Sequence, residues 1–228
     1  MSNDSSDSAS LLEQFLLPER LERLESVLAA RSDTLTVVLD RIRNAHNVSA
    51  ILRSADAFGL TEVHLVGDTF QHSRGISMGT ERWMRLRGHQ SPDAAIAALQ
   101  ADGFRIAVLR PEQQSETGPK PLPVTALPFQ EKLALVFGNE LRGVDDRFTD
   151  AADIHAFIPM RGFVESLNVS VACAICLFCS TIAPTSPARR TPTLSEDKRR
   201  LLRDDWLRAG VRHADVILTE LKARQEVE

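Results

Sequence analysis

The sequence lacks the features that place a protein in a membrane or outside the cell. None of its apolar runs approaches the ~18 residues that a membrane-spanning helix needs. Its start, MSNDSSDSAS, is polar and acidic, which is unlike a secretory signal. Its 3 cysteines are too few for a disulfide framework. From these absences we expect a cytoplasmic protein.

An overall excess of positive charge is also missing. The 27 Lys and Arg residues are outnumbered by 31 Asp and Glu residues, which gives a net charge of −4. This balance is unusual for an RNA-binding protein, because affinity for RNA comes largely from basic side chains that neutralise phosphates. The basic residues are unevenly spread, however: residues 184–212 contain 8 against 4 acidic residues, and residues 74–89 contain 4 against 1. The composition therefore permits a local basic face without requiring RNA.

Two common nucleotide-binding motifs are absent. The sequence contains no GxGxxG, which argues against a dinucleotide site of the Rossmann type. Gly138 and Gly143 have the spacing of a phosphate-binding P-loop, but Val144 stands where that motif requires Lys. A nucleotide triphosphatase is therefore disfavoured, and so is a small-molecule enzyme that depends on a phosphate loop.

A metal site is not expected either. The histidines are scattered without zinc-ligand spacing. Cys173, Cys176 and Cys179 form C-x-x-C-x-x-C, which could be read as iron–sulfur ligands. They lie in the apolar run ACAICLFC, where cysteine behaves as a small buried hydrophobe. The outer two, six positions apart, diverge around a helix. We interpret these cysteines as structural.

The patterns that are present predict an α/β protein with a mostly parallel sheet. Strands are predicted at 35–39, 62–66, 83–86, 104–109, 133–137 and 154–158, and the runs at 35–39, 104–109 and 133–137 are typical of buried strands. Helical spacing alternates with them at 48–58, 91–101 and 167–182, and such alternation is typical of parallel sheets. We divide the chain into a disordered start (1–9), an N-terminal helical extension (10–33), a central domain (34–183), and a linker with a C-terminal helical extension (184–228).

Several helix ends can be predicted from local sequence. Asn47 can cap the helix at 48–58, and Gly59 can end it. Ser91 and Pro92 are typical of the start of the next helix. Thr193 with Glu196 matches a capping box at the start of the C-terminal helices, which Gly210 is expected to divide.

Polar side chains follow three of the predicted strands at their carboxyl ends. The first strand leads into a loop that ends at Asn47, and the strand at 133–137 leads into Gly138-Asn139-Glu140. The strand at 154–158 leads to Ser166 and Asn168, at the start of the last core helix. Because ligands bind at this edge of open α/β sheets, we expect these residues to border a binding site.

Three stretches carry a resemblance to a known family. NAHNVSAILRSADAFG, FGNELRG and IPMRGFVESLNVSVA resemble, in the right order, the three motifs of the SpoU/TrmH branch of the SPOUT RNA methyltransferases. The resemblance covers residues 35–182, most of the chain. It implies transfer of a methyl group from S-adenosylmethionine to a ribose 2′-hydroxyl of RNA. It also implies a C-terminal trefoil knot, at about 133–182, and a homodimer.

The resemblance also assigns roles to individual residues. Arg53 matches the catalytic arginine of the first motif, and the other active-site positions are Asn47, Glu140, Ser166 and Asn168. The adenosine of the cofactor is expected to bind near Leu109, Gly138, Ile158, Met160 and Leu167. Candidate RNA-binding residues are Arg20, Arg23, His46, Arg82, Arg199 and Arg203. For His46 the alternative interpretation is a capping role, and for the arginines of the N-terminal helix it is a solvated helix face.

The substrate class follows from what surrounds the motifs. The extensions are short and helical, so the chain is most similar to the small tRNA enzymes that methylate a D-loop guanosine. Alternatives are 2′-O-methylation of another tRNA or rRNA nucleotide, and a non-catalytic RNA-binding protein on the same fold. The C-terminal extension from Thr193 departs from what we expect of those tRNA enzymes.

Overall fold

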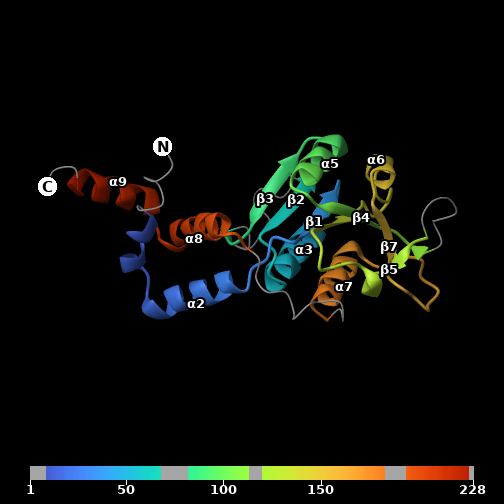
Figure 1. Cartoon of the computed structure of the whole chain (residues 1–228), viewed down its shortest axis with the longest axis horizontal. Coiled ribbons are helices and arrows are strands. Elements are labelled where there is room, and N and C mark those ends of the chain that lie inside the picture. The colour runs from blue at the N-terminus through green and yellow to red at the C-terminus, as the bar shows by residue number, and fades with distance from the viewer. Residues whose placement is uncertain (1–8, 68–81, 113–119, 183–193, 226–228) are drawn as a thin grey trace. The chain divides into compact units, whose positions relative to one another are not determined.

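The computed structural model describes residues 9–67, 82–112, 120–182 and 194–225 (Figure 1). The chain divides into two compact units, residues 32–191 and residues 1–31 with 192–228. The disorder predicted for residues 1–9 falls, except for Ala9, outside the described residues. The same holds for the loop at 68–81, the linker at 184–192 and the proposed cap Thr193.

The larger unit is built on a parallel sheet (Figure 1). Its described strands are β1 (Leu35–Asp40), β2 (Glu62–Val66), β3 (Arg85–His89), β4 (Arg105–Leu109), β5 (Leu122–Pro123), β6 (Leu133–Phe137) and β7 (Ile154–Phe157). Their order is β3-β2-β1-β6-β4-β7-β5, and every pair is parallel. The α/β prediction is confirmed. The trefoil knot stays a prediction.

The strand order reverses at β1, and this reversal places the binding edge. β2 and β3 extend the sheet on one side of β1, whereas β6 and the later strands extend it on the other. Leu35 pairs with Leu133 and Leu39 with Phe137, so β1 and β6 end together. The loops that follow these two strands therefore leave the same edge of the sheet, where open α/β folds bind ligands.

Helices cover both faces of this sheet (Figure 1). α3 (Ala45–Ala57) and α7 (Val169–Ile182) pack against each other and share one core with Leu35, Val37 and Leu39 of β1. α5 (Pro92–Ala101) and α6 (Asp146–Asp150) pack on the opposite face, against Val38 of the same strand. Since successive strand residues point to opposite faces, a strand buried on both sides is apolar throughout, as the run at 35–39 predicted.

Two predicted boundaries are wrong for identifiable reasons. The third strand is Arg85–His89 rather than 83–86, because its polar side chains pair with Glu62 and His64 of β2 instead of pointing into solvent. α3 begins at Ala45, and its cap is Asn44, whose side chain accepts hydrogen bonds from the amides of His46 and Asn47. Asn47 is therefore not the cap.

Other helix ends agree with the predictions or differ only in the residue used. Ser91 caps α5, and Gly59 and Gly103 take the left-handed conformation just after α3 and α5. The cap of α8 (Glu196–Gly210) is Ser195, whose hydroxyl accepts from the Lys198 amide. The helical run does break at Gly210, and α9 (Ala214–Gln225) follows.

The smaller unit is helical. It contains the short 3-10 turn η1 (Glu13–Phe15), α2 (Pro18–Ala29), and helices α8 and α9. α2 packs against α8 through apolar side chains, and the buried Trp206 lies 5.2 Å from the guanidinium carbon of Arg31. Arg203 joins the same helices, with its guanidinium 2.9 Å from Glu13 Oε1 and 2.5 Å from Glu25 Oε1.

α7 is apolar around its circumference but is not buried on all sides. Its cysteines are free and buried, as the structural interpretation predicted: Cys173, Cys176 and Cys179. Burial raises the pKa of Cys176 to about 12. Val171, Phe178 and Ile182 are about half exposed, so the described residues leave one stripe of α7 uncovered. Among the described helices, none is both long and apolar enough to cross a membrane.

Candidate active site

Loops from three neighbouring strands border one cavity of about 590 Å³. The end of β4 contributes Leu109, and the end of β6 with the loop after it contributes 137–144. The segment that leads from β7 into the start of α7 contributes Ile158, Met160 and 165–169. All five residues expected to hold the adenosine lie in its wall: Leu109, Gly138, Ile158, Met160 and Leu167. The volume falls within the range of small-molecule sites.

A chain of side-chain hydrogen bonds joins the three motifs beside this cavity. Asn47 Nδ2 donates to Glu140 Oε1 at 2.6 Å, and Asn168 Nδ2 donates to Asn47 Oδ1 at 3.1 Å. Asn47 is 8% exposed, whereas Glu140 is exposed at the rim. Because its amide is fixed on both sides, Asn47 holds Glu140 and Asn168 in a defined relation to each other.

Asn168 has a second task that orders the start of α7. Its Oδ1 accepts from the amides of Ser170 and Val171, at 2.9 and 3.4 Å, as a capping side chain does. Of the two candidates at this helix start, Asn168 is therefore the cap, and Ser166 lies exposed in the cavity wall. One asparagine thus ties the helix start to the hydrogen-bonded chain.

The turn that presents Glu140 requires glycine at Gly138. A Cβ atom at Gly138 would lie 2.2 Å from the carbonyl carbon of Gly143 and from the amide nitrogen of Val144. The backbones of Asn139 and Gly143 exchange two hydrogen bonds, at 3.0 and 2.8 Å, which close the turn. Gly143 has a φ of 71°, a conformation that suits glycine.

Arg53 lies outside this hydrogen-bonded chain. It is exposed on α3, it does not line the cavity, and no partner is found for it among the described residues. It lies six positions after Asn47, which places the two side chains about 120° apart around the helix at about 100° per residue. The catalytic role assigned to Arg53 stays a prediction.

Two further cavity residues were not identified from the sequence. Arg110 directly follows β4, and Arg142 lies in the same turn as Glu140. Arg110 could have been identified, because it follows a strand at the carboxyl edge, like the residues that were selected. With Glu140 and Glu165, the wall presents charges of both signs beside apolar residues, which suits a zwitterionic ligand with an apolar part.

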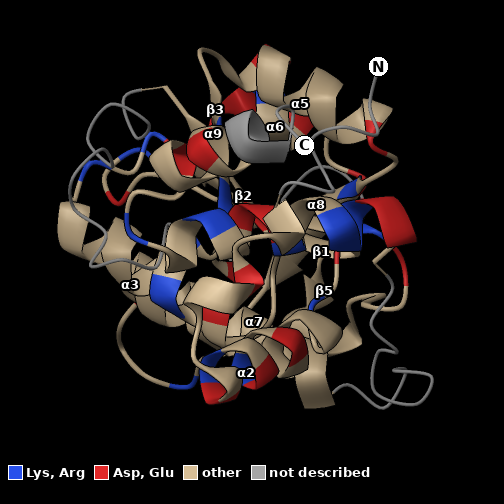
Figure 2. Cartoon of the chain, turned by 90° about the vertical axis from the view of Figure 1, so that its left-hand side faces the viewer, with Lys and Arg blue, Asp and Glu red and all other residues tan. Residues whose placement is uncertain are grey.

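The predicted RNA-binding residues lie in both units, and their role in RNA binding stays a prediction. Arg20 and Arg23 are exposed on α2 and Arg199 on α8, and His46 and Arg82 are exposed in the larger unit. Figure 2 shows that acidic residues accompany the basic ones on α2 and α8. Arg203 differs from the others, because its guanidinium is ion-paired with Glu13 and Glu25 and holds helices together.

The described residues give no sign of a metal centre, since they contain no cluster of three or more His, Cys, Asp or Glu side chains that could hold an ion. What the site offers is a cavity for an organic ligand with a fixed carboxylate at its rim.

Comparison with known proteins assigns this arrangement to a family. The family model described as the SpoU rRNA Methylase family matches residues 34–178, which include all three motifs and every wall of the cavity. The chain belongs to this family. Membership of this family thus accounts for both the sheet and the motif residues that meet at its edge.

Individual members are also similar over most of the chain. A protein named tRNA (guanosine(18)-2′-O)-methyltransferase from Borreliella burgdorferi is 32% identical over 180 residues, which cover 78% of this chain and 80% of that one. The crystal structure of the A. aeolicus TrmH/SpoU tRNA modifying enzyme is 30% identical, with a TM-score of 0.73, and covers 89% of this chain and 99% of that one. An AdoMet-bound rRNA methyltransferase from Sinorhizobium meliloti, 24% identical with a TM-score of 0.56 over 66% of this chain and 57% of that one, shares the fold.

Proposed function

We propose that this protein transfers a methyl group from S-adenosylmethionine to a ribose 2′-hydroxyl of tRNA. The observation that carries the proposal is the hydrogen-bonded chain Glu140–Asn47–Asn168 at the rim of the cavity. It joins one residue from each of the three motifs, and these motifs define a family of RNA methylases. A non-catalytic RNA-binding protein would have no need to keep this arrangement.

The cavity suits S-adenosylmethionine. Its volume is about 590 Å³, and its wall combines apolar side chains with the backbone of the Gly138 turn and with charges of both signs. Leu109, Ile158 and Leu167 would enclose the adenine, while a charged rim suits the methionine end. A protein of the same fold was solved with AdoMet bound. When bound, the cofactor supplies the methyl group.

The residues of the chain hold and polarise the nucleophile. In-line transfer requires the two reacting atoms to be held about 3–3.5 Å apart and aligned. Glu140 and Asn168, fixed through Asn47, orient the ribose at the mouth of the cavity. Arg53 is effectively always protonated, so we assign it to a phosphate of the RNA and to the charge that develops on the 2′-oxygen. Arg53 has no protein partner in the described residues, which leaves it available to RNA.

Guanosine 18 in the D-loop of tRNA is the substrate we propose, because relatives that match most of this chain are named for that nucleotide. The smaller unit adds helices α2, α8 and α9 to the methylase fold. Since tRNA is its substrate in this proposal, we infer that the protein works in the cytoplasm.

The test is methyl transfer to defined transcripts. Labelled S-adenosylmethionine and purified protein should incorporate one methyl group per tRNA transcript, and a transcript whose G18 is replaced by 2′-O-methylguanosine should accept none. Incorporation elsewhere in tRNA, or only into rRNA, would change the proposed substrate but not the proposed reaction. Retention of tRNA without any incorporation would support the non-catalytic alternative and overturn the proposal.

We also propose a homodimer formed through α7. Val171, Phe178 and Ile182 leave an apolar stripe about half exposed on this helix. A second copy of the same helix would cover that stripe at the usual gain of ~25 cal/mol per Å² of apolar surface. Sedimentation velocity should give a dimer for the native protein and a monomer for Phe178→Glu. A native monomer would overturn this part of the proposal.

A further inference from the structure

The Glu140 carboxylate stands on a turn that its neighbour Asn139 organises. Asn139 Oδ1 accepts from the amides of Leu141 and Arg142, at 3.0 and 3.3 Å. These bonds hold the two residues that directly follow Glu140, while the Asn139 backbone pairs with Gly143. The path of the main chain at Glu140 is therefore set by the Asn139 side chain.

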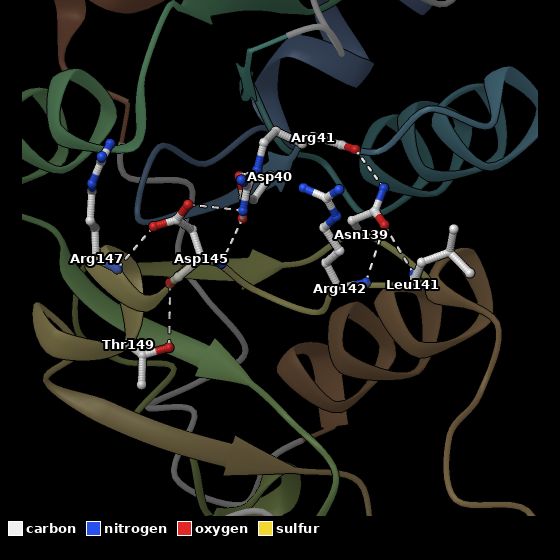
Figure 3. Close-up of polar contacts among 8 residues, drawn as sticks. All are labelled: Asp40, Arg41, Asn139, Leu141, Arg142, Asp145, Arg147 and Thr149. Atoms are coloured by element: carbon white, nitrogen blue, oxygen red, sulfur yellow. Dashed lines mark hydrogen bonds and ion pairs between the residues drawn. The ribbon is translucent and has the colours of Figure 1, made fainter.

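The same side chain also links two loops. Asn139 Nδ2 donates to the carbonyl oxygen of Arg41 at 2.9 Å (Figure 3). Arg41 lies between β1 and α3, in the segment that leads to Asn47, the residue bonded to Glu140. Asn139 thus bridges the loop that carries Glu140 and the loop that delivers its partner.

Arg41 is itself held in an unusual conformation. It has a φ of 54°, which is uncommon outside glycine and costs energy unless the surroundings fix it. Its Nε lies 3.0 Å from Asp40 Oδ1, and its guanidinium also reaches Asp145 Oδ2 at 3.0 Å (Figure 3). Asp40 is fully buried, and its Oδ2 accepts from the Asp145 amide at 2.8 Å. These bonds fix the direction of the Arg41 carbonyl.

We propose that Asn139 is a positioning residue for methyl transfer. It fixes the Glu140 carboxylate relative to Asn47 through the Arg41 carbonyl, and the Asp40–Arg41–Asp145 ion cluster anchors that carbonyl. The inference rests on the proposed function and deepens it, because it explains how a carboxylate at an exposed rim keeps one orientation. Asn139 lies in the cavity wall, but the polar atoms of its side chain are bonded to Arg41, Leu141 and Arg142, so we assign it no polar contact with substrate.

Kinetics of Asn139 variants test the inference. Asn139→Ala should lower kcat by about 10- to 100-fold, with KM for tRNA and for S-adenosylmethionine changed by less than roughly threefold. Asn139→Asp keeps the acceptor for Leu141 and Arg142 but cannot donate to Arg41, so it should also be impaired. Arg147→Ala is the matched control, because its side chain makes an ion pair with Asp93 at 3.3 Å in which both side chains are more than half exposed. Its kcat and its Tm should remain those of the native enzyme.

A double-variant cycle separates positioning from general support of the fold. If Asn139 acts through Glu140, then Asn139→Ala should change kcat by less than about twofold in a Glu140→Gln background. If the native enzyme is active but the effects of the two substitutions on kcat multiply, this inference alone is overturned. The same holds if Asn139→Ala lowers only Tm. A native protein that methylates no RNA would remove the proposed function and this inference together.

Discussion

Glycines in the loops that border the cavity have different structural requirements. Gly138 has backbone atoms of the same turn where a Cβ would stand, 2.2 Å away. Gly162, in the segment between β7 and α7, has nothing within 4 Å of that position and no unusual φ. Only Gly138 must be glycine, because only there would a side chain overlap backbone atoms of the same turn.

Replacement of these glycines should therefore give opposite results. Gly138→Ala should lower the free energy of unfolding by about 3 kcal/mol, because the new methyl group overlaps fixed backbone atoms. Gly162→Ala should change it by less than about 1 kcal/mol, in the stabilising direction, since it only restricts the unfolded chain. Urea unfolding measures both, and calorimetric titration shows whether S-adenosylmethionine binding is lost with Gly138. Equal effects would contradict the geometry of the turn.

Arg53 provides a prediction about chemistry rather than stability. Because it lies outside the cavity wall, Arg53→Ala should abolish turnover while leaving the Kd for S-adenosylmethionine nearly unchanged. Arg53→Lys should recover little activity, since an ammonium lacks the planar fork that grips a phosphate. Single-turnover kinetics with a separate titration of the cofactor would distinguish the two effects. Loss of cofactor binding would reassign Arg53 to that site.

A histidine pair joins strands β2 and β3. His64 is fully buried, its Nδ1 lies 2.9 Å from His89 Nε2, and the two rings are stacked. Glu62 and Arg87 lie beside them. Burial, together with the neighbouring His64 and Arg87, lowers the pKa of His89 to about 4. The folded protein thus keeps this histidine neutral.

The pair should make stability fall in mild acid. The unfolded chain takes up a proton on this histidine near its ordinary pKa of about 6.5, whereas the folded chain does so only near 4. Between these pH values, protons therefore bind preferentially to the unfolded state and lower the free energy of unfolding. The stabilising contribution of neutral His89 is complete above about pH 6.5. His89→Gln should flatten the pH dependence of the urea midpoint in this window. An unchanged slope would show that His89 does not titrate as described.

The contact between α2 and α8 depends on one aromatic side chain. Trp206 is 2% exposed and packs beside Arg31. Trp206→Ala should destabilise the smaller unit by about 3–5 kcal/mol, because it removes the largest buried side chain there. Leu201→Ala on the same helix, where the side chain is 47% exposed, should cost less than about 0.5 kcal/mol. Limited proteolysis of the native protein and the two variants would show whether α2 and α8 come apart.

Sequence patterns located most elements but not the partners of their polar residues. Strands such as β1 and β6 were found because burial on both faces makes them continuously apolar. Asn47 was taken for a cap because capping is local, whereas its actual partners lie 93 and 121 positions away in sequence. Asn139 and Arg41 were overlooked for the same reason: their bonds form only after the sheet brings their loops together.

At the level of the whole protein, the arginines have two roles: some are exposed and available to bind RNA, and others pair with acidic side chains of the protein. The net charge is −4, and some arginines, such as Arg203, already bind carboxylates of the chain. Affinity for tRNA would then depend on a limited set of exposed arginines, such as Arg20, Arg23 and Arg199. This set lies in the helical unit rather than in the methylase fold.

Removal of these three charges should weaken RNA binding selectively. The triple variant R20A/R23A/R199A should raise KM for tRNA and leave the Kd for S-adenosylmethionine unchanged. The salt dependence of tRNA binding should become shallower by about 0.7–0.9 for each phosphate that the variant no longer neutralises. Arg105→Ala, which removes an exposed arginine paired with Glu131, serves as the control. Unaltered tRNA binding in the triple variant would exclude this surface.

The long sequence separations in the hydrogen-bonded chain Glu140–Asn47–Asn168 have a consequence for biosynthesis. Residue 47 leaves the ribosome well before residue 168, so the nascent polypeptide carries one motif of the centre long before the last one. Products of premature termination before α7 would lack the capped helix start that closes the pocket. Cofactor capture and methylation are thereby restricted to chains whose translation has passed the last motif, and incomplete products cannot compete for tRNA as catalysts.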